Sequence, residues 1–358
     1  MACTDDLLMH SVLALSGAHL AFKQDLDASI QSATLRHYSE VIRGLRTEVG
    51  SLHMKDARGT LRLLLISIMV CHYEVLSGDM TGTTFKHLRA SRELILQLLS
   101  QPDGLTAGFL AFETDALGLC LELYAYIVIM NSLSPYGSVA TRTMPYDTFV
   151  LSLGTLSSYS TFGTMFGGIH GLFELIPQVA LLASQRLVEE ESGMTKPDPE
   201  TVAMHDSLEA RIRNWDLSPD PSEDTTEWEE RSTAGEVLRH ALYIYLSTAL
   251  AGSLISDPDI LSFIQFHIDA ILNMAGSLAE SHYACTLMWP LLIAGSCMVR
   301  ESQRTELVTR LRASRYRMKH VFSACDLLQK LWESHDPQAY GPYGLYMMER
   351  HDYCIPII

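Results

Sequence analysis

Residues 285–295 read CTLMWPLLIAG and contain no charged side chain. The stretch has the composition of a buried helix, yet it contains a proline. Pro290 lacks a backbone N–H, so it predicts that a helix bends or begins here and that Trp289 points in a fixed direction into the core. Gly295 predicts close packing of a neighbouring helix. Because the stretch is far shorter than the roughly 20 residues of a membrane span, we expect packed core. The indole of Trp289 either fills that core or also forms one wall of a pocket.

Helical periodicity extends over most of the chain. Apolar residues recur at spacings of three and four between Leu7 and Leu20 and again between Leu35 and Leu45. Asp257-Pro258 has the form of a capping residue followed by proline at the first helical position. Alternating strand patterns are scarce, so the sequence predicts an all-α fold. We expect one large domain of packed antiparallel helices over residues 1–358, with its core in 7–335 and a C-terminal tail in 336–358.

Two segments interrupt this periodicity. Residues 132–168 are rich in Ser, Thr, Gly and Tyr and predict an irregular crossing loop with short helical pieces. The glycines of FGTMFGGIHG, within residues 162–171, predict a shaped loop that lets a helix approach closely. Residues 217–233 are acidic and broken by proline, and they predict a solvated loop.

The composition excludes several classes of protein. Of the 358 residues, 47% are hydrophobic and 19% charged, which predicts a sizeable core. The formal net charge of −16 opposes direct nucleic-acid binding. The seven cysteines include no CxxC pair, so neither a disulfide framework nor a zinc site is expected. Residues 61–76 and 117–133 carry charges that are costly in lipid, and we expect no membrane span.

Several segments together resemble the regulatory domain of fungal Zn2Cys6 transcription factors, the fungal-specific transcription factor domain family. These segments, which cover roughly residues 7–335, include LLMHSVLALSGAHLAF, ATLRHYSEVIRGLR, LEARIRNWDLSP, EVLRHALYIYLSTAL and MWPLLIAGSCMVRESQRTELVTRL. The sequence departs from the family pattern at Phe85, where Trp is usual, and at Leu292, where Phe is usual. None of its cysteines has the spacing of the family's six-cysteine zinc cluster, which is expected upstream and reads DNA.

The resemblance implies transcription regulation in the nucleus and, in some members, the binding of an apolar metabolite within the helical domain. The module could act through a protein partner, and apolar helices with few charges are also compatible with a homodimer. We therefore expect a regulator-type module without its own DNA-binding domain, which senses an apolar small molecule or acts through a partner.

No known reaction signature is present: GxxxxGK[ST], GxSxG and HExxH are all missing. We expect neither a cofactor nor a metal, and no catalytic residue is identified. The sequence His72-Tyr73-Glu74 comes nearest to a polar cluster and could face a pocket as an acid or base. Alternatively, His72 and Glu74 lie on the solvent-facing side near a helix end. The pocket candidates are polar or aromatic residues within apolar sequence: Tyr73, His170, Tyr243, His282 and Trp289.

A second hypothesis assigns a different class of function. In secondary metabolism, a repurposed domain could bind a hydrophobic natural product and catalyse a cofactor-free cyclisation or a pericyclic, Diels-Alder-type step. It would do so mainly by holding one substrate conformation. Such a cyclase would be cytoplasmic. The missing signatures favour neither hypothesis, because this mechanism needs no metal, nucleophile or cofactor.

Overall fold

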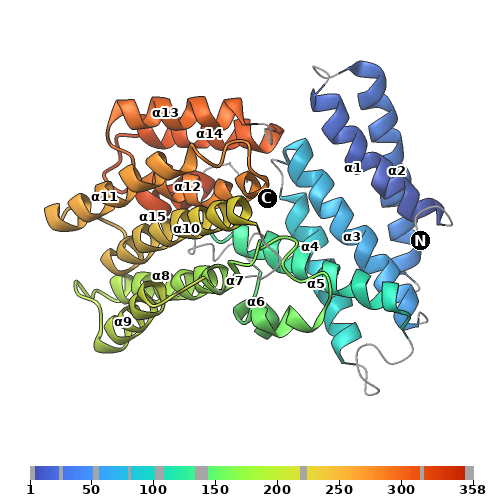
Figure 1. The fold of residues 1–358 in the computed structure, drawn as a ribbon, viewed down its shortest axis with the longest axis horizontal. Coiled ribbons are helices and arrows are strands. Elements are labelled where there is room, and N and C mark those ends of the chain that lie inside the picture. The colour runs from blue at the N-terminus through green and yellow to red at the C-terminus, as the bar shows by residue number, and fades with distance from the viewer. Residues whose placement is uncertain are drawn as a thin grey trace.

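The computed structural model describes residues 5–23, 27–50, 56–79, 82–100, 109–133, 144–217, 224–314 and 318–350. Within these residues every regular element is a helix, so the all-α prediction is confirmed. The helices fall into two groups joined by an irregular crossing segment (Figure 1). One core cluster of buried side chains runs through both groups, from Leu8 to Leu345.

The first group is built on two antiparallel helix pairs. Asp27 caps the second helix by accepting from the backbone N–H of Ser29, and Asp56 caps the third by accepting from Gly59 at 2.8 Å. The first helix packs on both the second and the third, and the fifth lies against the third. The bounds are α1 (Asp6–Lys23), α2 (Ala28–Val49), α3 (Ala57–Ser77), α4 (Thr83–Leu99) and α5 (Ala111–Met130).

The crossing segment is irregular, as predicted, over the part that the structure describes. It contains the short elements α6 (Thr148–Leu151), η3 (Leu153–Ser158) and α7 (His170–Phe173); residues 134–143 lie outside the described residues. Glu122 of α5 organises its end, because Oε1 of Glu122 accepts from the backbone N–H of Met165 at 2.7 Å and of Gly163 at 3.1 Å. Gly168 has φ +73°, a conformation that favours glycine, and the guanidinium of Arg231 fills the space beside it.

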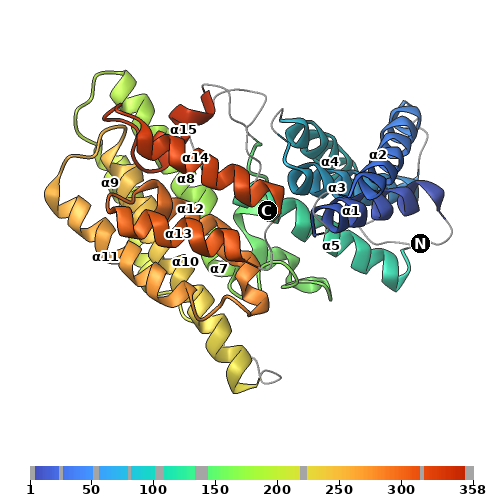
Figure 2. The same cartoon turned by 90° about the horizontal axis from the view of Figure 1, so that it is seen from above.

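The second group surrounds one long central helix. This helix, α10 (Thr225–Ala251), contacts α8 (Leu175–Glu191), α9 (Pro199–Arg213), α11 (Pro258–Ala275) and α12 (Met288–Ser296) (Figures 1 and 2). Asp257 caps the following helix by accepting from the N–H of Asp259, as its Asp-Pro sequence predicted. The bounds of the other elements are η4 (His282–Leu287), α13 (Glu301–Ala313), α14 (Lys319–Glu333) and α15 (Gly341–Arg350).

Within the stretch CTLMWPLLIAG, a 3-10 helix changes into an α-helix inside the core. The 3-10 helix η4 passes directly into α12, and Pro290 lies in the first turn of α12, where its missing N–H costs nothing. Trp289 is completely buried. A Cβ added at Gly295 would lie 2.7 Å from Leu307 and 2.9 Å from Leu328, which confirms the close packing predicted at this glycine.

Two boundaries differ from the sequence prediction. The predicted loop at 217–233 is wrong from Thr225 onward, where α10 begins; residues 218–223 lie outside the described residues. Asp224 caps this helix, and the acidic residues that suggested a solvated loop suit the positive end of a helix dipole. The predicted tail at 336–358 contains α15, and its Leu345 is 1% exposed and belongs to the core, so the core extends beyond residue 335.

Among the described residues, α3 is long and apolar enough to cross a bilayer by length and composition alone. Its polar residues have partners within the protein. Arg62 pairs with Asp5 and with Glu48, and Glu74 accepts a hydrogen bond from Tyr38. Because 61% of its most apolar window is buried in the protein, α3 is a core helix.

Candidate functional site

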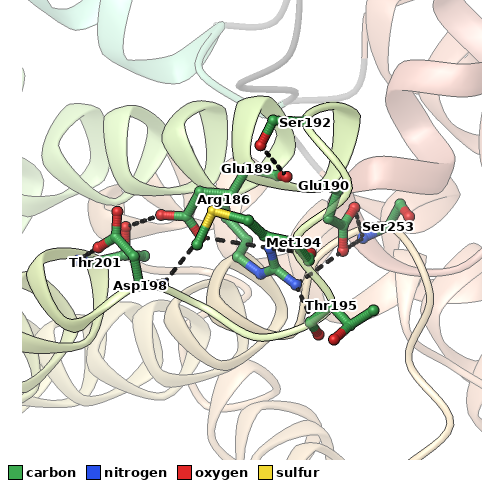
Figure 3. Close-up of polar contacts among 9 residues, drawn as sticks. All are labelled: Arg186, Glu189, Glu190, Ser192, Met194, Thr195, Asp198, Thr201 and Ser253. Atoms are coloured by element: carbon green, nitrogen blue, oxygen red, sulfur yellow. Dashed lines mark hydrogen bonds and ion pairs between the residues drawn. The ribbon is translucent and has the colours of Figure 1, made fainter.

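A buried polar clamp fixes the start of α9 against the end of α8 (Figure 3). Arg186 is 3% exposed, and its guanidinium donates to the carbonyl oxygens of Met194 and Thr195 at 3.4 and 3.3 Å. The same guanidinium pairs with Glu189 and Glu190, each at 3.4 Å. One buried cation therefore binds the loop between α8 and α9 to the end of α8.

The acidic partners of this clamp extend it in two directions (Figure 3). Glu189 accepts from the hydroxyl of Thr201 and from the N–H of Asp198, both at the beginning of α9. Glu190 accepts a hydrogen bond at 3.1 Å from the backbone N–H of Ser253, a residue just after the end of α10. The clamp thus sets the position of α9 relative to both α8 and α10.

A pocket of about 480 Å³ lies along the other end of α9, where this helix faces α7 and the start of α8. This volume is in the range of small-molecule sites, although the pocket is largely open to solvent rather than enclosed. Gly171 and Leu175 form one side of the pocket, and the α9 side is exposed to solvent. The remaining lining residues are Ser207, Ala210, Arg211, Asn214 and Trp215.

Trp215 forms the apolar wall of the pocket and also contacts two other helices. A Cβ added at Gly235 of α10 would lie 2.6 Å from Cη2 of the indole, and one at Gly171 of α7 would lie 3.3 Å from Nε1. The guanidinium of Arg239 lies over the indole, 5.2 Å from its centroid, and donates to the Trp215 carbonyl at 3.0 Å. Two glycines and one stacked arginine therefore hold this side chain in place.

A second polar cluster lies between α2, α3 and α4. Tyr38 donates a hydrogen bond to Glu74, which is 8% exposed, and the ring of Tyr38 stacks on Tyr73 at 4.4 Å. Burial raises the pKa of Glu74, whereas the bond from Tyr38 lowers it in part. Nε2 of His87 lies 4.0 Å from Oε1 of Glu74, and burial lowers the pKa of His87. Asp79, also buried, accepts from the N–H of Thr84 at 2.9 Å.

This cluster contradicts one of the two interpretations of His72-Tyr73-Glu74 for Glu74, and the pocket-facing interpretation stays a prediction. Glu74 faces inward, so the interpretation that placed it on the solvent-facing side is wrong. His72 is half-buried, and its Nδ1 bonds the carbonyl of Ile68 at 2.9 Å. The cluster has the ingredients of acid–base chemistry, but its groups bond one another and tie α2 to α3.

The structure places the five predicted pocket residues on five different helices. Tyr73 stacks on Tyr38, Tyr243 stacks on His267 at 5.0 Å, and the ring of Trp289 meets Tyr245 edge-on at 5.4 Å. His282 is exposed at the start of η4 and lies against Tyr283. His170 begins α7 and contacts Phe162, and it adjoins the pocket through its neighbour Gly171. None of the five side chains lines the pocket between α7, α8 and α9, and their role in binding stays a prediction.

Trp215, Arg211 and Asn214 were not among the predicted site residues. All three belong to the segment LEARIRNWDLSP, which contributed to the family resemblance alone. A tryptophan directly after a helix end, beside a polar loop, was the available signal. The glycines that receive its indole lie about 20 and 44 residues away in sequence, so their proximity requires the fold.

Comparison with known families agrees with the resemblance found in the sequence. The model of the fungal specific transcription factor domain matches residues 1–354. No curated protein and no solved structure shows significant similarity to the chain.

Proposed function

Because the chain belongs to the fungal specific transcription factor domain family, in which it is a transcription-regulator-type module, we propose that it senses a small molecule in the pocket between α7, α8 and α9. A nuclear location is part of this proposal. The bound molecule would alter the surface that the module presents to a protein partner, and DNA contact would come from elsewhere than this acidic chain.

The observation that carries the proposal is the double role of Trp215. Its indole lines the pocket and at the same time packs against glycine positions on α7 and α10. A molecule that shifts this side chain must also shift its contacts with α10, which packs against α8, α9, α11 and α12 among other elements. Packed helices respond to such a shift as units rather than by gradual deformation. Pocket occupancy is thereby linked to the arrangement of the second helix group.

The experiment tethers the chain to a heterologous DNA-binding domain upstream of a reporter gene. We expect the tethered chain to change reporter output relative to the DNA-binding domain alone. Ala210→Trp fills the pocket and should alter that output severalfold. Val202→Trp is the matched control, because it places the same bulk on an exposed position of α9 outside the pocket lining.

Two results would contradict the proposal. A tethered chain indistinguishable from the DNA-binding domain alone would remove the regulatory function. Equal output from wild type and Ala210→Trp, with both proteins folded, would remove the pocket from it. Conversion of a bound hydrophobic compound into a cyclised product by the purified chain would instead favour the cyclase hypothesis.

A further inference from the structure

Arg211 lines the pocket and forms no ion pair with a carboxylate among the residues that the structure describes. Nη1 of Arg211 donates to the amide oxygen of Gln178 at 2.5 Å, a neutral partner. Its neighbours differ: Arg213 pairs with Glu209, and Arg239 pairs with Glu236 at 2.9 Å. A guanidinium has five N–H donors, so one bond to Gln178 leaves donors for a ligand.

The other polar groups of the pocket suit the same kind of ligand. Arg211 is the charged residue of the lining, Ser207 lies one turn before it on α9, and Asn214 is the C-cap of this helix. All three side chains are exposed and can be reached from solvent. Arginine binds a carboxylate through two parallel N–H···O bonds, which fixes its orientation as well as its position.

The remaining lining is apolar and includes the indole of Trp215, one face of which Arg239 covers. Leu175 is buried and Ala210 is half-buried, and the indole of Trp215 stands beside them. Aromatic rings pair with an indole in offset-stacked or edge-on geometry and add stabilisation beyond the area they bury. A ligand with a flat apolar body therefore fits this part of the pocket better than a fully polar one.

We propose that the pocket takes an amphipathic organic anion: a small molecule with a flat apolar body against Trp215 and Leu175 and one carboxylate at Arg211. This inference deepens the proposed function by naming the class of molecule sensed, and its physiological meaning rests on that function. The overall charge of −16 disfavours anions at long range. Charge screening in ordinary salt limits that repulsion to about 10 Å. Binding of an anion in the pocket therefore depends mainly on its direct contact with Arg211.

The test measures binding of 1-naphthylacetate and of its neutral analogue 1-naphthylacetamide to the full chain by titration calorimetry. The two probes share one apolar body and differ in the charge of one group. We expect wild type to bind the acid roughly tenfold more tightly than the amide, because hydrogen bonds to charged groups are the stronger ones. Arg211→Gln should abolish that preference, and Trp215→Leu should weaken binding of both probes.

Arg213→Gln is the control for a general change in surface charge, and it should keep the preference for the acid. Equal affinities of wild type for the two probes would overturn the inference, as would a preference that survives in Arg211→Gln. Failure of wild type to bind either probe would overturn it as well. None of these results changes the reporter comparison between Ala210→Trp and Val202→Trp, so failure of the ligand class is distinguishable from failure of the sensing function.

Discussion

The indole of Trp215 occupies the space that a side chain at Gly235 would need: a Cβ there would lie 2.6 Å from Cη2. Overpacking usually costs about 1–3 kcal/mol, so Gly235→Ala should destabilise the protein by up to about 2 kcal/mol once the gain in helix propensity is subtracted. That gain is up to about 1 kcal/mol when alanine replaces glycine in a helix interior. Urea unfolding measures the change.

Gly154→Ala is the matched control, because the nearest atom to a Cβ there is Oε1 of Glu174 at 3.9 Å, an ordinary contact. We expect this variant to unfold within about 0.5 kcal/mol of wild type. A Gly235→Ala protein as stable as wild type would show that Trp215 is free to move away from α10, contrary to the link described above.

Arg186 is the buried cation of the clamp in Figure 3. Arg186→Met leaves Glu189 buried without its cation, and breaking such a pair costs about 3–5 kcal/mol. We expect a loss of this size in urea unfolding. Arg213→Met, which removes an exposed pair with Glu209 on the neighbouring helix, should cost less than about 1 kcal/mol. Similar losses in the two variants would mean that the clamp does not hold α9.

Glu74 gives the unfolding free energy a definite pH dependence. Its pKa is raised above 4.5 in the folded protein, so the folded state binds more protons than the unfolded chain. The contribution of Glu74 to the free energy of unfolding is greatest below about pH 4.5 and falls as pH rises through the raised pKa. Glu74→Gln should lack that fall, so the difference in unfolding free energy between wild type and variant should decrease as pH rises. Tyr38→Phe should extend the fall to higher pH, because the Tyr38 hydroxyl lowers the pKa of Glu74. A parallel pH profile for Glu74→Gln and wild type would contradict this assignment.

His267 gives the unfolding free energy a pH dependence opposite to that of Glu74. Burial and the neighbouring His240 lower its pKa from 6.5 to about 4, and the two Nδ1 atoms lie 2.5 Å apart, so one ring donates to the other. Because the folded state binds fewer protons, stability from His267 is full above pH 6.5 and declines as pH falls towards 4. Unfolding of His267→Gln followed over this range should lack that decline. A decline of equal size in the variant would place its origin in other groups.

The periodicity of the sequence determined most of the fold. Apolar spacing and capping residues located the helices around Leu7, Leu35 and Pro258, because such signals are local. Local signals also explain the wrong loop prediction after residue 224, because acidic residues suit both a solvated loop and the first turn of a helix.

The candidate site was harder to predict from sequence. Glu74 could have been placed correctly, because positions 67, 71 and 74 share one face of α3, which is buried. The pocket could not, because it depends on how the helix end at Trp215 meets Gly171 and Gly235. No spacing rule connects residues that distant in sequence.

The central claim is that occupancy of the pocket is transmitted through Trp215 to α7 and α10. Hydrogen exchange of the backbone amides, measured with and without saturating 1-naphthylacetate, tests it most directly. We predict slower exchange in α7 and in the part of α10 around Gly235, with α1 and α2 unchanged and with no slowing in Trp215→Leu. Protection confined to other helices, or the same protection in Trp215→Leu, would contradict the account.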